Sequence, residues 1–81
     1  MRNRSMLSCW IVEALKFYGG SASIVKICEY IWSNYELSLR ESGELFYTWQ
    51  YDIRWEATRL RKQGVIKSAN QSLQGIWDLA V

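Results

Sequence analysis

The chain has 81 residues, of which 49% are hydrophobic and 15% aromatic, and its formal net charge is +2. This length predicts a single domain over residues 1–81, and the hydrophobic share excludes a disordered chain. The absence of histidine excludes catalytic triads and metal sites built on that residue. No apolar run is long enough to span a bilayer, and the basic N-terminus leads into an amphipathic segment, so we expect neither a membrane span nor a signal peptide.

Residues 5–18 predict a first helix, because their apolar side chains recur at the three- and four-residue spacing of an amphipathic helix. Either Asn3 or Ser5 is expected to cap its start. Gly19 and Gly20 are expected to end it, since glycine is common just past the last helical turn.

Residues 21–23 predict a brief strand, and Ser23 is the expected N-cap of a second helix over residues 24–35. Many β-branched residues make this helix a poor one by intrinsic preference, so packing must hold it. Residues 36–46 show no clear period, and we expect a connector there that can include one helical turn and is broken at Gly43.

A third helix is predicted from about Thr48 to Gln63, with Gly64 just past its end. Four apolar side chains of this helix fall within about 80° of one another around its axis. We expect this side to face the core, and it consists of Trp49, Ile53, Ala57 and Leu60.

The C-terminal segment predicts a hairpin, with residues 65–67 as one strand, residues 68–72 as a polar loop, and residues 73–79 as the returning strand. Gly75 is a candidate bulge in the returning strand. The order helix, short strand, helix, helix and hairpin predicts a winged helix-turn-helix. The expected class is therefore α+β, mostly α, with the hairpin as the wing.

Cys9 and Cys28 are assigned to apolar helical positions, and two cysteines are too few for a disulfide framework. We therefore expect two buried free thiols in a cytoplasmic protein.

The charge is divided along the chain. Residues 1–28 sum to +3, residues 29–52 to −4, and residues 53–67 to +4. Such a division bears on binding partners rather than on the fold. The last of these segments coincides with the third helix and the start of the hairpin.

Three segments, 42–47, 55–66 and 72–79, resemble the N-terminal winged-helix domain of Mrr-like restriction endonucleases. The shared order is a Ser-Gly pair before an apolar-aromatic segment, then a Trp, a Leu and basic residues. A Gly with an apolar residue follows, and then a hairpin with a Gly, an aromatic residue and a Leu. The residues that fit are Trp55, Leu60, Arg61, Lys62, Gly64, Val65, Gly75, Trp77 and Leu79.

The resemblance covers roughly residues 40–80, and the first two helices agree only in pattern. Gln74 replaces an Arg that usually precedes the hairpin Gly, Glu56 replaces a small residue, and about two extra residues lie between Tyr47 and Trp55. The resemblance implies DNA binding by a module that directs a nuclease, often toward modified DNA. This chain contains no nuclease domain, so it does not imply cleavage here, and no catalytic residue or cofactor is predicted.

The third helix is basic over most of its non-core surface, which suits a helix that enters the major groove. Residues near the start of a recognition helix usually reach the bases, which makes Gln50, Tyr51 and Arg54 candidates for base contacts. Later positions are expected to contact the DNA backbone, namely Thr58, Arg61 and Lys62.

The hairpin offers further polar side chains for a phosphate or the minor groove, namely Lys67, Asn70, Gln71 and Ser72. Arg2 and Arg4 are candidates for an arm on the DNA backbone.

The aromatic residues of the third helix leave alternatives open. We expect Trp49 in the core and Trp55 packed beneath the wing or the second helix, and the alternative for Trp55 and Tyr51 is contact with a base or a partner protein. Tyr47 faces the same choice.

The acidic segment is expected to be a solvated connector rather than a metal site, because its spacing matches no hard-metal loop. It would repel phosphate and so orient the domain on DNA. Its members are Glu36, Glu41, Glu44 and Asp52.

The expected partner is double-stranded DNA, together with a nuclease domain or a second copy of the chain. A protein-interaction or dimerisation module without DNA binding is the alternative, because 12 aromatic residues can build a partner surface. Exposure of Arg54, Arg61 and Lys62 on one continuous face would favour DNA. Their pairing with the acidic segment would remove the main support for that function.

Overall fold

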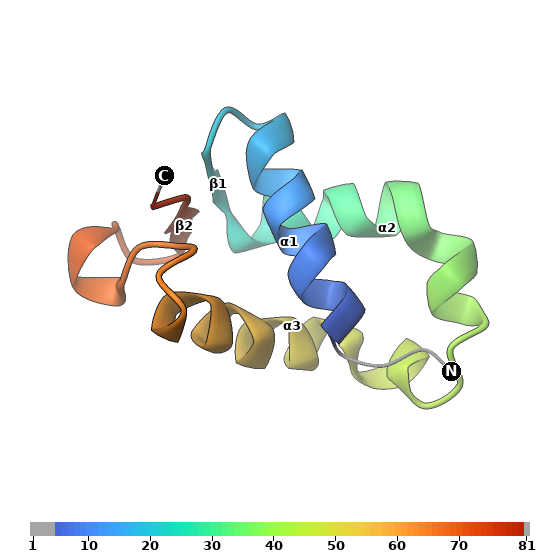
Figure 1. The fold of residues 1–81 in the computed structure, drawn as a ribbon. Helices are drawn as coiled ribbons and strands as arrows, with labels where there is room; N and C mark the ends of the chain where they lie inside the picture. The colour runs from blue at the N-terminus through green and yellow to red at the C-terminus, as the bar shows by residue number, and fades with distance from the viewer. Residues whose placement is uncertain (1–4, 81) are drawn as a thin grey trace.

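A computed structural model describes residues 5–80, and this part contains three α-helices and a two-stranded antiparallel sheet (Figure 1). The predicted winged helix-turn-helix, an α+β fold that is mostly helical, is confirmed. None of the described helices is both long and apolar enough to cross a membrane. The elements in order are α1 (Ser5–Phe17), β1 (Ser21–Ser23), α2 (Ile24–Arg40), α3 (Leu45–Lys62), a 3-10 turn (Ala69–Gln71) and β2 (Ile76–Asp78).

Helix α1 forms where its apolar spacing predicted it and packs against both α2 and α3. Leu7, Ile11 and Leu15 are fully buried on its inner side. Each such side chain contributes about 1.5–3 kcal/mol by leaving water. The helix ends as predicted at Gly19, whose φ of 82° is a conformation that other residues rarely adopt. The N–H of Gly20 closes the end by donating to the carbonyl of Leu15 at 2.7 Å.

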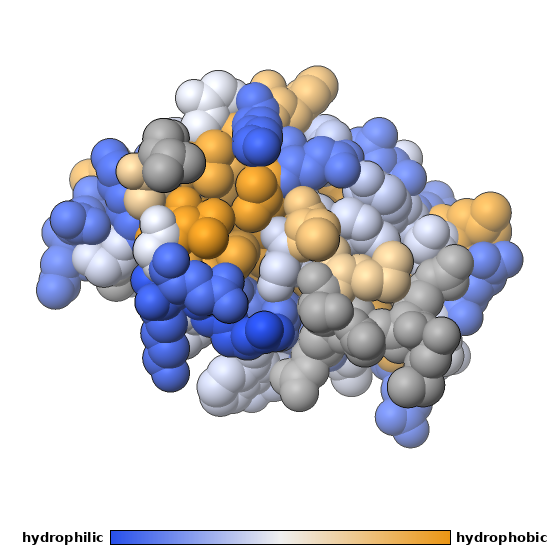
Figure 2. All heavy atoms as spheres, in the orientation of Figure 1, coloured by the Kyte–Doolittle hydropathy of each residue, from blue (hydrophilic) through white to orange (hydrophobic). Residues whose placement is uncertain are grey.

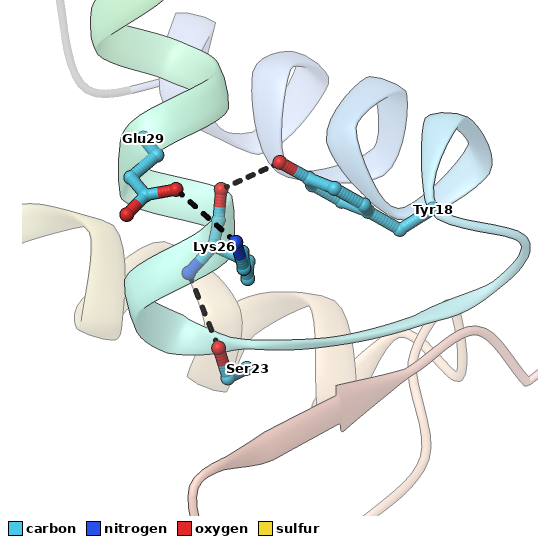
Figure 3. A network of polar contacts seen from close by, with 4 residues as sticks. All are labelled: Tyr18, Ser23, Lys26 and Glu29. Atoms are coloured by element: carbon cyan, nitrogen blue, oxygen red, sulfur yellow. Dashed lines mark hydrogen bonds and ion pairs between the residues drawn. The ribbon is translucent and has the colours of Figure 1, made fainter.

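The predicted cap of α2 is confirmed, and neighbouring contacts hold the same turn (Figure 3). The Ser23 hydroxyl oxygen accepts the N–H of Lys26 at 3.2 Å, satisfying one of the free donors of the first turn. The hydroxyl of Tyr18 donates to the Lys26 carbonyl at 3.3 Å, which ties the end of α1 to the start of α2. The Lys26 ammonium lies 3.6 Å from the Glu29 carboxylate on the exposed surface.

Helix α2 continues beyond its predicted end. Tyr35 has the non-helical angles φ −130° and ψ 19°, so the regular helix breaks where the prediction ended it, but residues 36–40 resume the helix after the kink. The helical turn that the predicted connector allowed is therefore present at residues 36–40, but it continues α2 instead of standing apart from it. Two local features stabilise the extra turn: Leu39 is fully buried, and Arg40 pairs with Glu36 at 2.8 Å.

Helix α3 begins three residues earlier than predicted, at Leu45. Glu44 makes no side-chain cap bond, so no capping residue marks this start, and Leu45 is buried instead. The predicted core side is confirmed for Trp49, Ile53, Ala57 and Leu60, each at most 5% exposed. Gly64 ends the helix as predicted, with φ 77°.

The wing differs in its pairing from the predicted hairpin. Strand β2 pairs with β1, with Trp77 opposite Ala22, and the segment after α3 joins only through the bridge between Ile66 and Leu79. Gly75 is not a bulge: its φ is 79°, it lies in the turn before β2, and its carbonyl accepts the N–H of Ile24. In Figure 1 this segment loops out beyond the last turn of α3 and returns as β2 beside β1.

The cysteine prediction was wrong for Cys9, which is exposed, while Cys28 is half-buried, and both are free thiols. Cys9 lies two residues from Leu7 and from Ile11, which places it about 200° around the helix from either of those buried side chains. The predicted cap residue Asn3 and the predicted arm of Arg2 and Arg4 lie outside the described residues.

A carboxylate holds the kinked part of α2 against α1. Glu13 accepts hydrogen bonds from the hydroxyls of Tyr35, at 2.6 Å, and Tyr30, at 2.7 Å. Trp10 stacks on Tyr35 with ring centroids 4.2 Å apart. The bonds from Tyr35 and Tyr30 lower the pKa of Glu13. In return, the bond to Glu13 is the main cause that raises the pKa of Tyr35 from 10.0 to about 12.

The hydrogen bond between Tyr35 and Glu13 predicts that the folded state loses stability at alkaline pH. Because the folded-state pKa of Tyr35 is raised, the hydrogen bond contributes fully to the free energy of unfolding below pH 10.0. This contribution is lost as the pH rises toward about 12. A spectrophotometric titration of tyrosinate should therefore show a late-ionising tyrosine, and Glu13→Gln should move this step to lower pH. Glu29→Gln, a control at a carboxylate paired with Lys26, should leave the step in place. Coincident curves for Glu13→Gln and the wild type would show that the bond does not exist in solution.

Candidate nucleic-acid interface

The outer side of α3 presents most of the predicted DNA contacts. Gln50, Arg54, Thr58 and Lys62 are exposed. They lie about 80–200° around the helix axis from Leu60 on the buried side. In Figure 2, hydrophilic side chains gather over the C-terminal half of α3 and over the neighbouring wing. The sequence-predicted residues of the helix are thus brought together on one side of it.

The cations of this side are not neutralised by the acidic segment. Within residues 5–80, no ion pair joins Arg54, Arg61 or Lys62 to a carboxylate. Arg54 and Lys62 are exposed, whereas Arg61 is half-buried. The ion pairs of the described residues are Lys26–Glu29, Arg40–Glu36 and Arg59–Glu56.

Arg61 connects α3 to the wing. Its Nε donates to the backbone carbonyl of Lys67 at 3.1 Å. The remaining guanidinium donors are available to a phosphate, because arginine carries several N–H groups in one plane. Lys67 itself is exposed at this junction. The last turn of α3 and the first residues of the wing therefore form one cationic corner.

Two predicted contact residues also have structural bonds. The Thr58 hydroxyl donates to the Arg54 carbonyl at 3.1 Å, so it offers a ligand mainly its lone pairs. The Gln71 side-chain oxygen accepts the N–H of Ser68 at 3.4 Å and so helps to hold the wing turn. Asn70 is exposed at the tip, whereas Ser72 is half-buried beneath it.

The aromatic residues of α3 separate into a buried and an exposed set. Trp49 is 4% exposed and stacks on Trp32 at 6.3 Å, which confirms the prediction of a core residue. Trp55 is 51% exposed, so the expected packing beneath the wing or α2 was wrong. Tyr51 contacts Trp55 edge to face at 6.2 Å and is exposed, as is Tyr47. The open alternative for these side chains, contact with a base or a partner, stays a prediction.

A cleft of about 420 Å³ opens between α2 and α3, beside the side of α3 that carries Arg54 and Lys62. Trp32 and Trp49 line it together with Gln50 and Arg54, so two predicted base-contacting residues stand at an apolar surface. Burial raises the pKa of the Cys28 thiol in this cleft, and the charge of Arg54 opposes that effect. Sequence reasoning missed the cleft, because it exists only where two separately predicted helices meet.

Glu56 was not predicted to be buried, yet it is only 3% exposed. The Ser8 hydroxyl donates to its Oε1 at 2.6 Å, and Arg59 Nη1 donates to the same oxygen at 2.8 Å. This carboxylate therefore connects α1 to α3 on the side of α3 away from the cleft. The sequence did contain a signal for this burial. Glu56 follows Asp52 by four residues and directly precedes the buried Ala57, so it lies at the margin of the apolar side of α3.

The members of the acidic segment lie at the kinked end of α2, in the turn that follows it, and in the first half of α3. Glu41 and Glu44 are exposed, and Asp52 accepts a hydrogen bond from Thr48 at 2.7 Å. Among the described residues, no three acidic or cysteine side chains are grouped so as to hold a metal ion. Comparison with known proteins adds no assignment, since no family model, curated protein or solved structure matches the chain.

Proposed function

We propose that this domain binds double-stranded DNA, with α3 in the major groove and the wing against the phosphate backbone. The observation that supports this function is the outer side of α3, where exposed Arg54 and Lys62 have no acidic partner within residues 5–80. A polyanion is the natural ligand of such a surface, because phosphate contacts supply most of the affinity of DNA-binding domains.

The positions along α3 suggest a division of roles. Gln50, Tyr51 and Arg54 lie nearer the start of the helix than Thr58 and Lys62 do, and they are proposed to contact base edges, since arginine and glutamine can each form paired hydrogen bonds there. The second group holds the backbone and consists of Thr58, Arg61, Lys62, Lys67, Asn70 and Gln71.

The domain is proposed to act in the cytoplasm, either as the targeting module of a restriction-type nuclease or as a small regulator. The resemblance of residues 40–80 to Mrr-like N-terminal domains supports the first of these roles. Its nuclease partner would then be another domain or chain, because no catalytic constellation is predicted in these 81 residues. A dimerisation module without DNA binding is the second candidate, and the further large hydrophobic side chains that are exposed outside α3, among them Phe17, Val25 and Leu37, favour it.

Two single substitutions test the proposed roles. Arg54→Ala should weaken binding by about 1–3 kcal/mol and change the preference among duplex sequences or modified bases. Lys62→Ala should weaken binding evenly across sequences and reduce the salt slope by about 1. Fluorescence anisotropy of labelled duplexes at several salt concentrations measures both effects.

Lys16→Ala is the matched control, because Lys16 is exposed on α1 and carries the same charge. This variant should change the salt slope less than Lys62→Ala does. Small and equal effects of Arg54→Ala and Lys62→Ala would contradict the assigned roles.

A further inference from the structure

Three large aromatic side chains stand in a row on the exposed side of α3. Tyr47 is 84% exposed, Tyr51 63% and Trp55 51%, and they are spaced four residues apart. Side chains at this spacing lie above one another on the same side of a helix. A row of this kind departs from the usual burial of aromatic residues and indicates a contact surface.

The area of the row argues against a second copy of the chain as its occupant. Aromatic side chains bury about 150–250 Å² each when wholly covered, so three partly exposed ones offer on the order of 300–500 Å². A stable protein–protein interface buries about 800 Å² on each partner. The row alone therefore falls short of a dimer interface.

The charges beside the row indicate what covers it. Arg54 lies between Tyr51 and Trp55, and Lys62 follows Trp55 about two helical turns later; neither cation has an acidic partner in the described part of the chain. A ligand that fits this surface must be anionic and must also present flat apolar faces. Nucleic acid combines both properties, in its phosphates and its bases.

Intact duplex satisfies only half of this requirement. In a duplex each base face is covered by its neighbours, and only base edges are accessible in the grooves. Successive rings of the row rise by about 6 Å along the helix axis, given about 1.5 Å per residue. This exceeds the about 3.4 Å spacing of bases along a stacked strand, and the Tyr51 and Trp55 rings meet at an interplanar angle of 67°. Each ring can therefore stack on a base only through its own outer face, which requires a strand whose bases have separated.

We infer that this aromatic row, Tyr47, Tyr51 and Trp55, binds unpaired bases of single-stranded DNA by stacking, while Arg54 and Lys62 hold the phosphates. The inference rests on the proposed function, because it uses the same side of α3, and it extends the ligand to DNA with single-stranded segments. The cleft beside Gln50 and Arg54 gives an unpaired base an adjacent apolar surface with hydrogen-bonding groups at its margin.

The test compares two labelled probes, a single-stranded oligonucleotide of mixed pyrimidines and the duplex of the same sequence. The double variant Tyr47→Ala, Trp55→Ala, which leaves the proposed base-edge contact Tyr51 in place, should weaken single-strand binding by at least about tenfold, since stacking of one base is worth about five- to 150-fold in affinity. Duplex affinity should change less than about threefold, because edge contacts do not use the ring faces. Tyr47→Phe, combined with wild-type Trp55, should bind the single strand like the wild type, because it keeps the ring.

Lys62→Ala is the control, since it should weaken both probes to a similar degree. Both altered side chains are more than half exposed, so the double variant should keep the fold, which its circular dichroism checks. Equal losses on both probes, or no loss on the single strand, would overturn the inference and leave duplex binding standing. Failure of the wild type to bind either probe would overturn both the inference and the proposed function.

Discussion

Trp49→Ala should destabilise the domain by about 3–5 kcal/mol, the range for deleting a large buried aromatic side chain. Trp49 is 4% exposed, stacks on Trp32 and lines the cleft between α2 and α3. Its loss would leave a cavity where the helix-turn-helix pair packs. In a domain of this size the melting temperature should fall by roughly 12 °C or more. Thermal and urea unfolding followed by circular dichroism measure the change.

Trp55→Ala is the matched control, because it removes the same side chain from the same helix. Trp55 is 51% exposed and contacts Tyr51 on the outer surface, so its loss should change stability by less than about 1 kcal/mol. The two variants together test the separation of a buried from an exposed side of α3. Equal destabilisation by both would mean that Trp55 packs in the core after all.

Glu56→Ala is expected to have the second largest effect, a loss of about 1.5–3 kcal/mol, because hydrogen bonds to a charged group contribute on this scale. The side chain is buried between α1 and α3 and accepts bonds from Ser8 and Arg59. Arg59 remains more than half exposed, so water can solvate its guanidinium when the carboxylate is removed. This limits the penalty below that of a fully buried ion pair. Chemical denaturation measures the loss.

Glu56→Gln removes the negative charge but keeps the size of the side chain and an oxygen that accepts hydrogen bonds. Its amide oxygen can still accept from Ser8, so this variant should recover a large part of the stability lost by Glu56→Ala. Glu44→Ala, at an exposed carboxylate without a cap bond, should be nearly neutral. A Glu56→Ala protein as stable as the wild type would show that the connection between α1 and α3 does not contribute to folding.

Periodicity predicted those parts of the fold in which a long element buries one side. The apolar sides of α1 and α3 are buried as predicted, and the glycines at 19 and 64 end their helices. Capping chemistry likewise located the start of α2 at Ser23. In each case the information lies within a few turns of chain, which is what a local pattern can report.

The misses have tertiary causes. The position of the connector's helical turn, at residues 36–40 and continuous with α2, was not predicted, because the turn is too short to show a period and burial of Leu39 stabilises it. Strand β2 pairs with β1, more than 50 residues away in sequence, and local propensity contains no information on that choice. Burial of Glu56 depends on a hydroxyl presented by another helix, Ser8 of α1.

The candidate site was predicted in composition but not in shape. An angular projection of α3 was sufficient to place Arg54 and Lys62 on the same side as its exposed tyrosines. The projection could not predict the cleft beside these side chains, or the hydrogen bond from Arg61 that joins α3 to the wing. It also could not decide the position of Trp55, which depends on whether another element covers that side of α3.

The most direct test of the central claim is fluorescence anisotropy of a labelled random-sequence duplex, titrated with the wild-type domain at several salt concentrations. A phosphate-contacting surface built on α3 and the wing predicts binding that weakens steeply and log-linearly as salt rises. Absence of binding at low salt would contradict the account, and the basic side of α3 would then be a solvated or protein-facing surface.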